Sequence, residues 1–176
     1  NKGCIPGVEK AGELFEAGEM FLPELISAGE ATKVAMDILL PEVKNSEGEW
    51  KSAGTYVIGT VEGDVHDIGK TIVSSMLSAS GFEVIDLGID VPTKRFVDVV
   101  KEKKPDILGL SALLTITMPK QKEVIDALKE EGLRDKVKVF VGGAPVTAAW
   151  AEQIGADGYA EDAVAAVKIA KSAIEG

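Results

Sequence analysis

Two kinds of hydrophobic pattern divide the chain. Up to about residue 43, apolar residues recur at helical spacing in two runs, which the sequence Ala17-Gly18-Glu19 separates. The members of these runs are Val8, Ala11, Leu14 and Phe15, then Leu25, Ile26, Val34, Ile38 and Leu39. Two helices of this length bury little surface alone, so we expect them to pack on another part of the protein. Because the pattern starts almost at Asn1, we also expect further helices before it.

After a polar linker over residues 44–54, short apolar runs alternate with helical segments. The predicted strands are Thr55–Val61, Glu83–Leu87, Asp106–Ser111, Lys136–Val141 and Gly158–Ala160. The predicted helices are Ile68–Ser80, Thr93–Lys103, Pro119–Glu131, Thr147–Ile154 and Asp162–Ile174. This alternation indicates an α/β fold with a doubly wound, five-stranded parallel sheet. The chain therefore divides into a helical segment (1–43), a linker (44–54) and an α/β domain (55–176).

Composition and charge narrow the function. The 176 residues carry a net charge of −10, and such a surface repels nucleic acids and anionic membranes. The single cysteine, Cys4, cannot form an internal disulfide, which suits a reducing cytoplasm. The single histidine, His66, excludes a zinc site built from several histidines.

The loop after the first predicted strand carries the most distinctive chemistry. In open α/β sheets the ligand crevice lies beyond the carboxyl ends of the strands, where the sequence reads Glu62-Gly-Asp-Val-His-Asp-Ile-Gly-Lys70. A metal-binding imidazole needs an acceptor for its other N–H, and Asp64 lies two residues before His66. Gly69, at the start of a helix, lets a bulky group approach the backbone. The alternative, of about equal weight from these residues alone, is that His66 caps the helix or only packs in the loop.

Two further strand ends carry small or hydroxyl side chains. Ser111, Thr115 and Thr117 place hydroxyls in an otherwise apolar stretch, where they need polar partners or cap the following helix. Gly142 and Gly143 follow the fourth predicted strand and form either a plain turn or one wall of a slot along the sheet edge. None of these features is decisive alone.

Taken together, these strand ends resemble the cobalamin-binding domain of methionine synthase and its relatives. The resemblance rests on Asp64-x-His66-x-x-Gly69, Ser111-x-Leu113 and Gly142-Gly143, and it covers Thr55 to Gly176. The segment from Gly12 to Pro23 is similar to the helical cap that precedes this domain in methyl-transferring members. In length and order the chain most resembles the small corrinoid proteins of methylamine and methanol methyltransferase systems. The resemblance implies a flavodoxin-like, cobalamin-binding fold behind a partial helical-bundle cap.

The resemblance also implies roles for individual residues. His66 would be the lower cobalt ligand, in place of the cofactor's own benzimidazole. Asp64 would accept a hydrogen bond from the other ring nitrogen of His66. Thr117 would place a hydroxyl beside this pair, at the position where methionine synthase has a serine. These three are the candidate catalytic residues. The implied cofactor-binding residues are Gly63, Asp64, Val65, His66, Asp67, Gly69, Ser111, Leu113, Thr115, Gly142, Gly143 and Ala163.

The implied function is that of a corrinoid methyl carrier, which is not a complete enzyme by itself. Its partners would be a substrate-specific methyltransferase, a second methyltransferase that acts on a thiol or a pterin, and a reductive activase. No nucleic acid or membrane is expected as a partner, and the location is expected to be cytoplasmic.

Other classes fit the sequence less well. The small subunit of an adenosylcobalamin-dependent mutase shares the Asp64-x-His66 loop but lacks the helical cap. A flavodoxin-like electron carrier needs a hydroxyl-rich phosphate loop after the first strand, where this chain has carboxylates. A phospho-receiver needs an aspartate at the end of the third strand, where this chain has Ser111. A cobalamin-dependent regulator would need a DNA-binding module, and a dinucleotide enzyme would need the missing Gly-x-Gly-x-x-Gly sequence.

Overall fold

A five-stranded parallel sheet forms the centre of the computed structural model, which describes residues 4–45 and 52–175. The strands are β1 (Thr55–Thr60), β2 (Glu83–Asp86), β3 (Ile107–Ser111), β4 (Lys138–Gly142) and β5 (Gly158–Ala160). Their order is β2-β1-β3-β4-β5, and every neighbouring pair is parallel. The central strands β1 and β3 are buried along most of their length, because both faces of the sheet are covered. The predicted fold class is confirmed.

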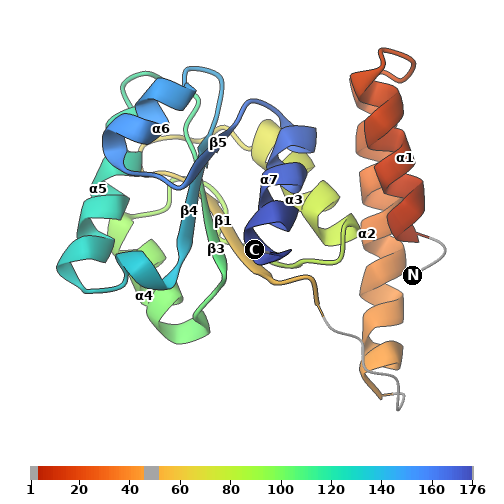
Figure 1. The fold of residues 1–176 in the computed structure, drawn as a ribbon, viewed down its shortest axis with the longest axis horizontal. Coiled ribbons are helices and arrows are strands. Elements are labelled where there is room, and N and C mark those ends of the chain that lie inside the picture. Colours follow the sequence, from red (N-terminus) through yellow and green to blue (C-terminus); the bar gives the residue numbers. More distant parts are fainter. Residues whose placement is uncertain (1–3, 46–51, 176) are drawn as a thin grey trace.

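Helices form a layer on each face of the sheet (Figure 1). One layer holds α3 (Ile68–Ala79) and α7 (Ala163–Glu175), and the other holds α4 (Thr93–Lys103), α5 (Met118–Glu130) and α6 (Ala148–Ile154). Each layer encloses its own hydrophobic core: Leu77 and Phe82 are buried on the α3 side, and Phe96 and Leu128 on the other. The carboxyl ends of all five strands therefore meet at one edge between the layers.

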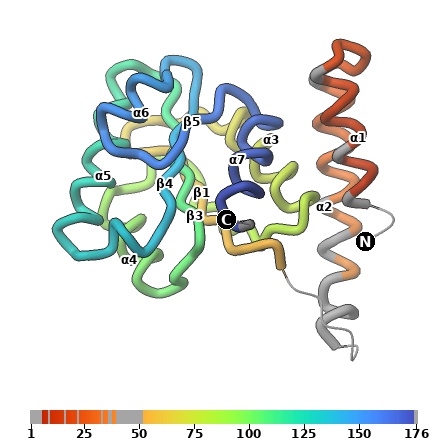
Figure 2. The backbone as a smooth tube through the Cα atoms, in the orientation of Figure 1, coloured from red at the N-terminus to blue at the C-terminus, as the bar shows by residue number. Residues whose placement is uncertain are grey.

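The two N-terminal helices stand outside α3, as the backbone trace shows (Figure 2). They are α1 (Cys4–Glu16) and α2 (Leu22–Asn45), and they pack on α3 through buried residues such as Ala11 and Leu25. Helix α2 reaches two residues into the segment expected to be a linker, and residues 46–51 of that segment lie outside the described residues. No helix in the described ranges is both long and apolar enough to cross a membrane.

One strand begins later than its pattern predicts. The apolar run indicated a strand from Lys136, but Arg134–Lys136 form a 3₁₀ turn and β4 starts at Lys138. The Lys136 N–H donates to the Leu133 carbonyl at 2.9 Å, and the Arg134 guanidinium donates to the Val137 carbonyl at 3.2 Å. These local hydrogen bonds hold the chain in a turn, which hydrophobic spacing alone does not reveal.

Candidate functional site

The loop between β1 and α3 is shaped by its own backbone contacts. Gly63 has φ +81°, a conformation that favours glycine, and its N–H donates to the Asp90 carboxylate at 2.7 Å. The Asp64 N–H closes the turn on the Val61 carbonyl at 3.1 Å. At the far end, the Thr60 hydroxyl donates to the His66 carbonyl at 2.9 Å. The loop thus folds back on the end of β1 and presents Asp64 and His66 at the sheet edge.

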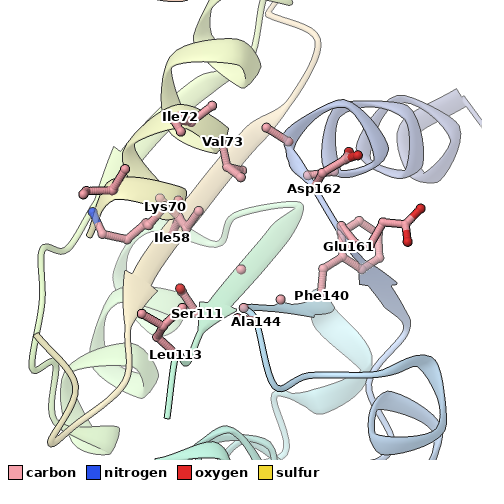
Figure 3. Close-up of a pocket in the computed structure, with 18 of the residues that line it drawn as sticks. Ile58, Lys70, Ile72, Val73, Ser111, Leu113, Phe140, Ala144, Glu161 and Asp162 are labelled. Carbon is pink, nitrogen blue, oxygen red and sulfur yellow. The ribbon is translucent and has the colours of Figure 1, made fainter. Parts of the chain in front are cut away.

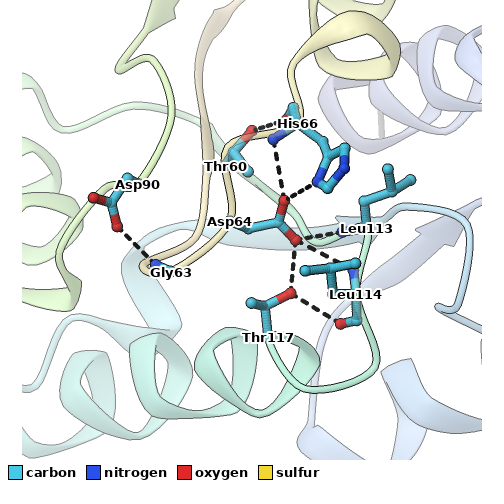
Figure 4. Close-up of polar contacts among 8 residues, drawn as sticks. All are labelled: Thr60, Gly63, Asp64, His66, Asp90, Leu113, Leu114 and Thr117. Carbon is cyan, nitrogen blue, oxygen red and sulfur yellow. Dashed lines mark hydrogen bonds and ion pairs between the residues drawn. The ribbon is translucent and has the colours of Figure 1, made fainter.

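The Asp64 carboxylate is fully buried and accepts hydrogen bonds on both oxygens (Figure 4). Oδ1 accepts from the His66 N–H at 3.1 Å and faces His66 Nδ1 at 2.8 Å. Oδ2 accepts from the N–H groups of Leu113 and Leu114, at 2.7 and 3.2 Å, and from the Thr117 hydroxyl at 2.6 Å. The carboxylate therefore joins the loop after β1 to the loop after β3.

These contacts decide the protonation of Asp64. Burial alone would raise the pKa of this carboxyl, but the hydrogen bonds from Thr117, from the His66 ring and from the backbone N–H groups of Leu113 and His66 outweigh it. The pKa of Asp64 is therefore held well below its usual range. The group is a carboxylate at neutral pH and can only accept hydrogen bonds.

The charge on Asp64 sets the tautomer of His66. Because a carboxylate only accepts, the 2.8 Å contact places a proton on His66 Nδ1 and leaves the lone pair on Nε2. The His66 side chain is 46% exposed, although its partner is completely buried. The N-cap position of α3 belongs to Asp67. The geometry thus favours an oriented, accessible nitrogen donor over the helix-capping alternative for His66.

Thr117 joins the same network from far along the chain. It occupies the N-cap position of α5, yet its hydroxyl lies against Asp64 and also 2.9 Å from the Leu114 carbonyl. The residue is buried, at 5% exposure. Asp64, His66 and Thr117, the three candidate catalytic residues of the sequence, are therefore brought together.

A cavity of about 550 Å³ opens beside His66, between α3 and the β5–α7 connection (Figure 3). Ile72 and Val73 of α3 line one side, and Glu161 and Asp162 lie at the other. The cavity extends down over β1, β3 and β4, and Phe15 and Leu25 of the N-terminal helices also line it. A deep, mostly apolar slot with few polar groups is the form expected of a cofactor site.

Glycines shape this slot in two different ways. Gly143 has φ +121°, and a Cβ there would lie 1.9 Å from the Ala112 carbonyl oxygen, so the protein's own packing demands glycine. At Gly69 a Cβ would meet no heavy atom of the described chain within 4 Å, and φ lies outside the left-handed region. Nothing within the described protein requires glycine at 69. The open space there fits a bulky group that lies close to the start of α3.

Most of the predicted cofactor-binding residues line the cavity. Those that do are Val65, His66, Asp67, Gly69, Ser111, Leu113, Gly142, Gly143 and Ala163. Asp64 and Thr117 lie behind His66 and reach the cavity only through it. Gly63 and Thr115 are exposed in their loops and are not among the described residues that line the cavity. Contact of these two residues with a cofactor stays a prediction.

The sequence reasoning overlooked much of the cavity floor. Tyr56 and Ile58 of β1 and Phe140 of β4 line the floor, and Ile72 and Val73 of α3 line one side. Ordinary strand and helix periodicity made these residues core positions. A usable signal was Gly109 on β3, since a glycine in a buried strand leaves room for a large side chain from its neighbour, here the Tyr56 ring.

The metal-ligating side chains at this site suit a metal ion that is already bound by an organic cofactor. Among the described residues, no three His, Cys, Asp or Glu side chains come together as a metal site. His66 offers a single oriented nitrogen beside a slot large enough for an organic group. One imidazole binds a free ion weakly, but it can complete the coordination of a metal already held by a macrocycle.

Comparison with known proteins agrees with this geometry. The B12 binding domain family matches residues 54–168, and a second family of the same description matches residues 1–40. The trimethylamine corrinoid protein 1 of Methanosarcina acetivorans is 53% identical over 162 residues, which cover 92% of this chain and 75% of that protein. The dimethylamine corrinoid protein 2 of the same organism is 53% identical over 175 residues, 99% of this chain and 81% of that one.

The chain belongs to the methylamine corrinoid protein family. Among solved structures, the methanol:cobalamin methyltransferase complex MtaBC of Methanosarcina barkeri contains a chain with a TM-score of 0.84 and 38% identity, over 98% of this chain and 65% of that one. As a corrinoid protein, the chain binds a B12-type cofactor and serves as a methyl carrier in a methyltransferase system.

Proposed function

We propose that this corrinoid protein holds its cofactor through His66 Nε2, with the cofactor's own base displaced into the slot beside the sheet. The single observation that carries this proposal is the contact between Asp64 Oδ1 and His66 Nδ1, which leaves Nε2 unprotonated at the mouth of the cavity. When bound, a corrinoid supplies a cobalt centre that accepts a methyl group and gives it up to a nucleophile.

The residues around His66 orient it for this role. Asp64 holds the ring by its Nδ1 proton, and the Leu113 and Leu114 N–H groups and the Thr117 hydroxyl hold Asp64 in turn. Such outer contacts raise the basicity of a histidine ligand and fix its direction.

The slot walls would bind the nucleotide part of the cofactor. Gly142 and Gly143 line one side without side chains, and Ser111 places a hydroxyl at the rim. Ile72, Val73 and Phe140 exclude water from the interior. These side chains select a flat aromatic group by shape, because a mostly apolar slot gives little direction by hydrogen bonds.

The methyl donor is proposed to be a methylamine. Relatives named for trimethylamine and for dimethylamine are equally similar to this chain, at 53% identity, so the number of methyl groups on the amine stays open. We propose a substrate-specific methyltransferase as one partner, by analogy with the complex from Methanosarcina barkeri. A second methyltransferase would pass the methyl group to a thiol or a pterin, and a reductive activase would maintain the cofactor, all in the cytoplasm. The chain would then be non-catalytic by itself.

A titration with hydroxocobalamin tests the proposal. The protein should bind it with a visible spectrum typical of histidine ligation, and His66→Ala should lose that spectrum and bind more weakly. Glu62→Gln is the matched control, since Glu62 is exposed in the same loop and does not line the cavity. An unchanged spectrum in His66→Ala would refute the ligand assignment.

A further inference from the structure

Asp90 has an unusual backbone conformation in the connection between β2 and α4. Its φ is +50°, and among the described residues Lys104 is the one other non-glycine residue with a positive φ. Lys104 ends helix α4, where this conformation is common. No helix ends at Asp90. Aspartate tolerates left-handed backbone better than most residues, but only glycine adopts it freely, so the conformation of Asp90 requires another reason.

That reason lies in the loop after β1, which Asp90 contacts through two different groups. The Gly63 N–H donates to the Asp90 carboxylate at 2.7 Å (Figure 4), and the Asp90 N–H donates to the Asp64 carbonyl at 2.9 Å. The two contacts enclose the peptide bond that joins Gly63 to Asp64. A single residue in the left-handed conformation thus fixes the main chain on both sides of this peptide bond.

The connection that carries Asp90 is itself anchored to the end of β1. The Thr60 N–H donates to the Gly88 carbonyl and the Val91 N–H donates to the Thr60 carbonyl, both at 3.0 Å. Beyond them, Val61 and Val91 form one further parallel bridge. Asp90 is exposed to solvent, but it is attached to a segment that continues the pairing of the sheet. It can therefore hold the loop that carries Asp64.

Asp64 is held from both sides of its own strand, because β1 lies between β2 and β3. The loop after β3 holds its carboxylate through Leu113 and Thr117, and Asp90 holds its main chain from the connection after β2. Both are needed to keep Asp64 Oδ1 2.8 Å from His66 Nδ1, since a carboxylate moves with its backbone. Asp90 is not among the described residues that line the cavity, so it acts on His66 only through Asp64.

We propose that Asp90 is a positioning residue, which fixes the main chain at Asp64 so that the Asp64 carboxylate keeps His66 directed at the cofactor. This inference rests on the proposed function, because it requires His66 to be the cobalt ligand. Two substitutions separate the parts of the argument. Asp90→Asn keeps an oxygen that can accept from Gly63 and a side chain that tolerates left-handed backbone. Asp90→Gly relaxes the backbone but removes the acceptor.

The test measures three quantities for each variant. These are the melting temperature of the apoprotein, the tautomer of His66 by nitrogen NMR, and the dissociation constant for hydroxocobalamin from visible absorbance. Asp90→Gly should melt close to the unaltered protein, because glycine adopts the conformation freely and the lost hydrogen bond lies at the surface. It should nevertheless show a smaller population with the proton on Nδ1, and bind hydroxocobalamin about 3- to 10-fold more weakly, the range for one hydrogen bond. Asp90→Asn should retain both properties.

Lys104→Gly is the matched control. It makes the same exchange at the other left-handed residue, which lies where the chain enters β3, at the opposite edge of the sheet from His66. It should change neither the tautomer nor the dissociation constant.

The outcomes separate this inference from the function on which it rests. An unchanged tautomer and dissociation constant in Asp90→Gly overturn the positioning role while corrinoid binding stands. Equal losses in Asp90→Asn and Asp90→Gly also overturn it, since the charge of Asp90 and not its contact with Gly63 would then be responsible. A large fall in the melting temperature of Asp90→Gly would assign Asp90 a structural role instead. If the unaltered protein binds hydroxocobalamin without histidine ligation, the proposed function itself fails.

Discussion

The Thr117 hydroxyl lies 2.6 Å from Asp64 Oδ2, on the opposite side of the carboxylate from His66. The two residues are 53 positions apart, and their loops become neighbours because β1 and β3 pair with Thr60 opposite Ser111. Thr117 therefore acts on His66 only through Asp64. Thr117 orients the Asp64 carboxylate, and the carboxylate in turn orients the His66 imidazole.

Replacing Thr117 with valine should test this connection. The variant keeps the shape of the side chain but removes a hydrogen bond to a charged, buried group, so the apoprotein should lose about 2 kcal/mol of unfolding free energy. Denaturant unfolding followed by circular dichroism measures the loss. Thr117→Ser restores the hydroxyl and should recover most of it; a serine variant as unstable as the valine one would show that the methyl group matters more than the hydrogen bond.

The tautomer of His66 should depend on Asp64. Nitrogen NMR of the apoprotein reports this directly, because the chain has a single histidine. We expect the proton on Nδ1 in the unaltered protein and a shift of population towards Nε2 in Asp64→Asn, whose amide cannot serve every donor now facing the carboxylate. The same tautomer in both proteins would contradict the orienting role of Asp64.

The stability of the apoprotein should fall in acid partly because of Asp64. The pKa of Asp64 is lowered in the folded state, while an aspartate in an unfolded chain has a pKa of about 3.9. Between these values the unfolded chain binds a proton that the folded chain does not, so the contribution is complete at neutral pH and is lost as the pH falls below about 4. Urea unfolding from about pH 6 to about pH 3 measures the slope. It should be shallower in Asp64→Asn; parallel slopes in the two proteins would exclude Asp64 as a source.

Two glycine substitutions should separate the fold from the cofactor site. Gly143→Ala places a Cβ against the Ala112 carbonyl in a backbone conformation that favours glycine, so the apoprotein should be destabilised by more than about 3 kcal/mol. Gly69→Ala lies in the first turn of α3 with open space around its Cβ, and should leave the melting temperature unchanged or slightly raised. Its affinity for hydroxocobalamin should nevertheless fall about tenfold, equivalent to about 1.4 kcal/mol. Full affinity in Gly69→Ala would mean that the space at Gly69 is not used by the cofactor.

The sequence predicted the features that depend on neighbouring residues in one loop or on the alternation of strands and helices. The alternation of strand and helix patterns was enough for the sheet, and the pairing of Asp64 with His66 follows from two residues in one loop. The part of Thr117 came from a family resemblance, and the structure supplies its physical basis in the pairing of β1 with β3. The contact between Thr117 and Asp64 also requires the turn after β3 to point towards the sheet edge. The spacing of residues in the sequence does not predict that direction.

The rest of the site depends on how far each side chain reaches into the cavity and on the direction in which it points. Hydrophobic periodicity predicts neither. Tyr56 was expected only as a core residue of β1, and its reach across Gly109 into the cavity follows from the side-chain conformation. Thr115 lies in the same turn as Thr117 but is exposed, so the structure gives it no contact with Asp64 and its contact with a cofactor stays a prediction. Two residues of a tight turn point in different directions, so their shared hydroxyl chemistry did not imply a shared location.

Electron paramagnetic resonance of the Co(II) form with ¹⁵N-labelled histidine tests the central claim most directly. Because His66 is the single histidine, the label reports on one residue only. If His66 Nε2 binds cobalt, the nitrogen splitting of the cobalt signal must change from a triplet in unlabelled protein to a doublet in labelled protein. A triplet that persists with labelled histidine would show that the cofactor keeps its own base, and would contradict the account.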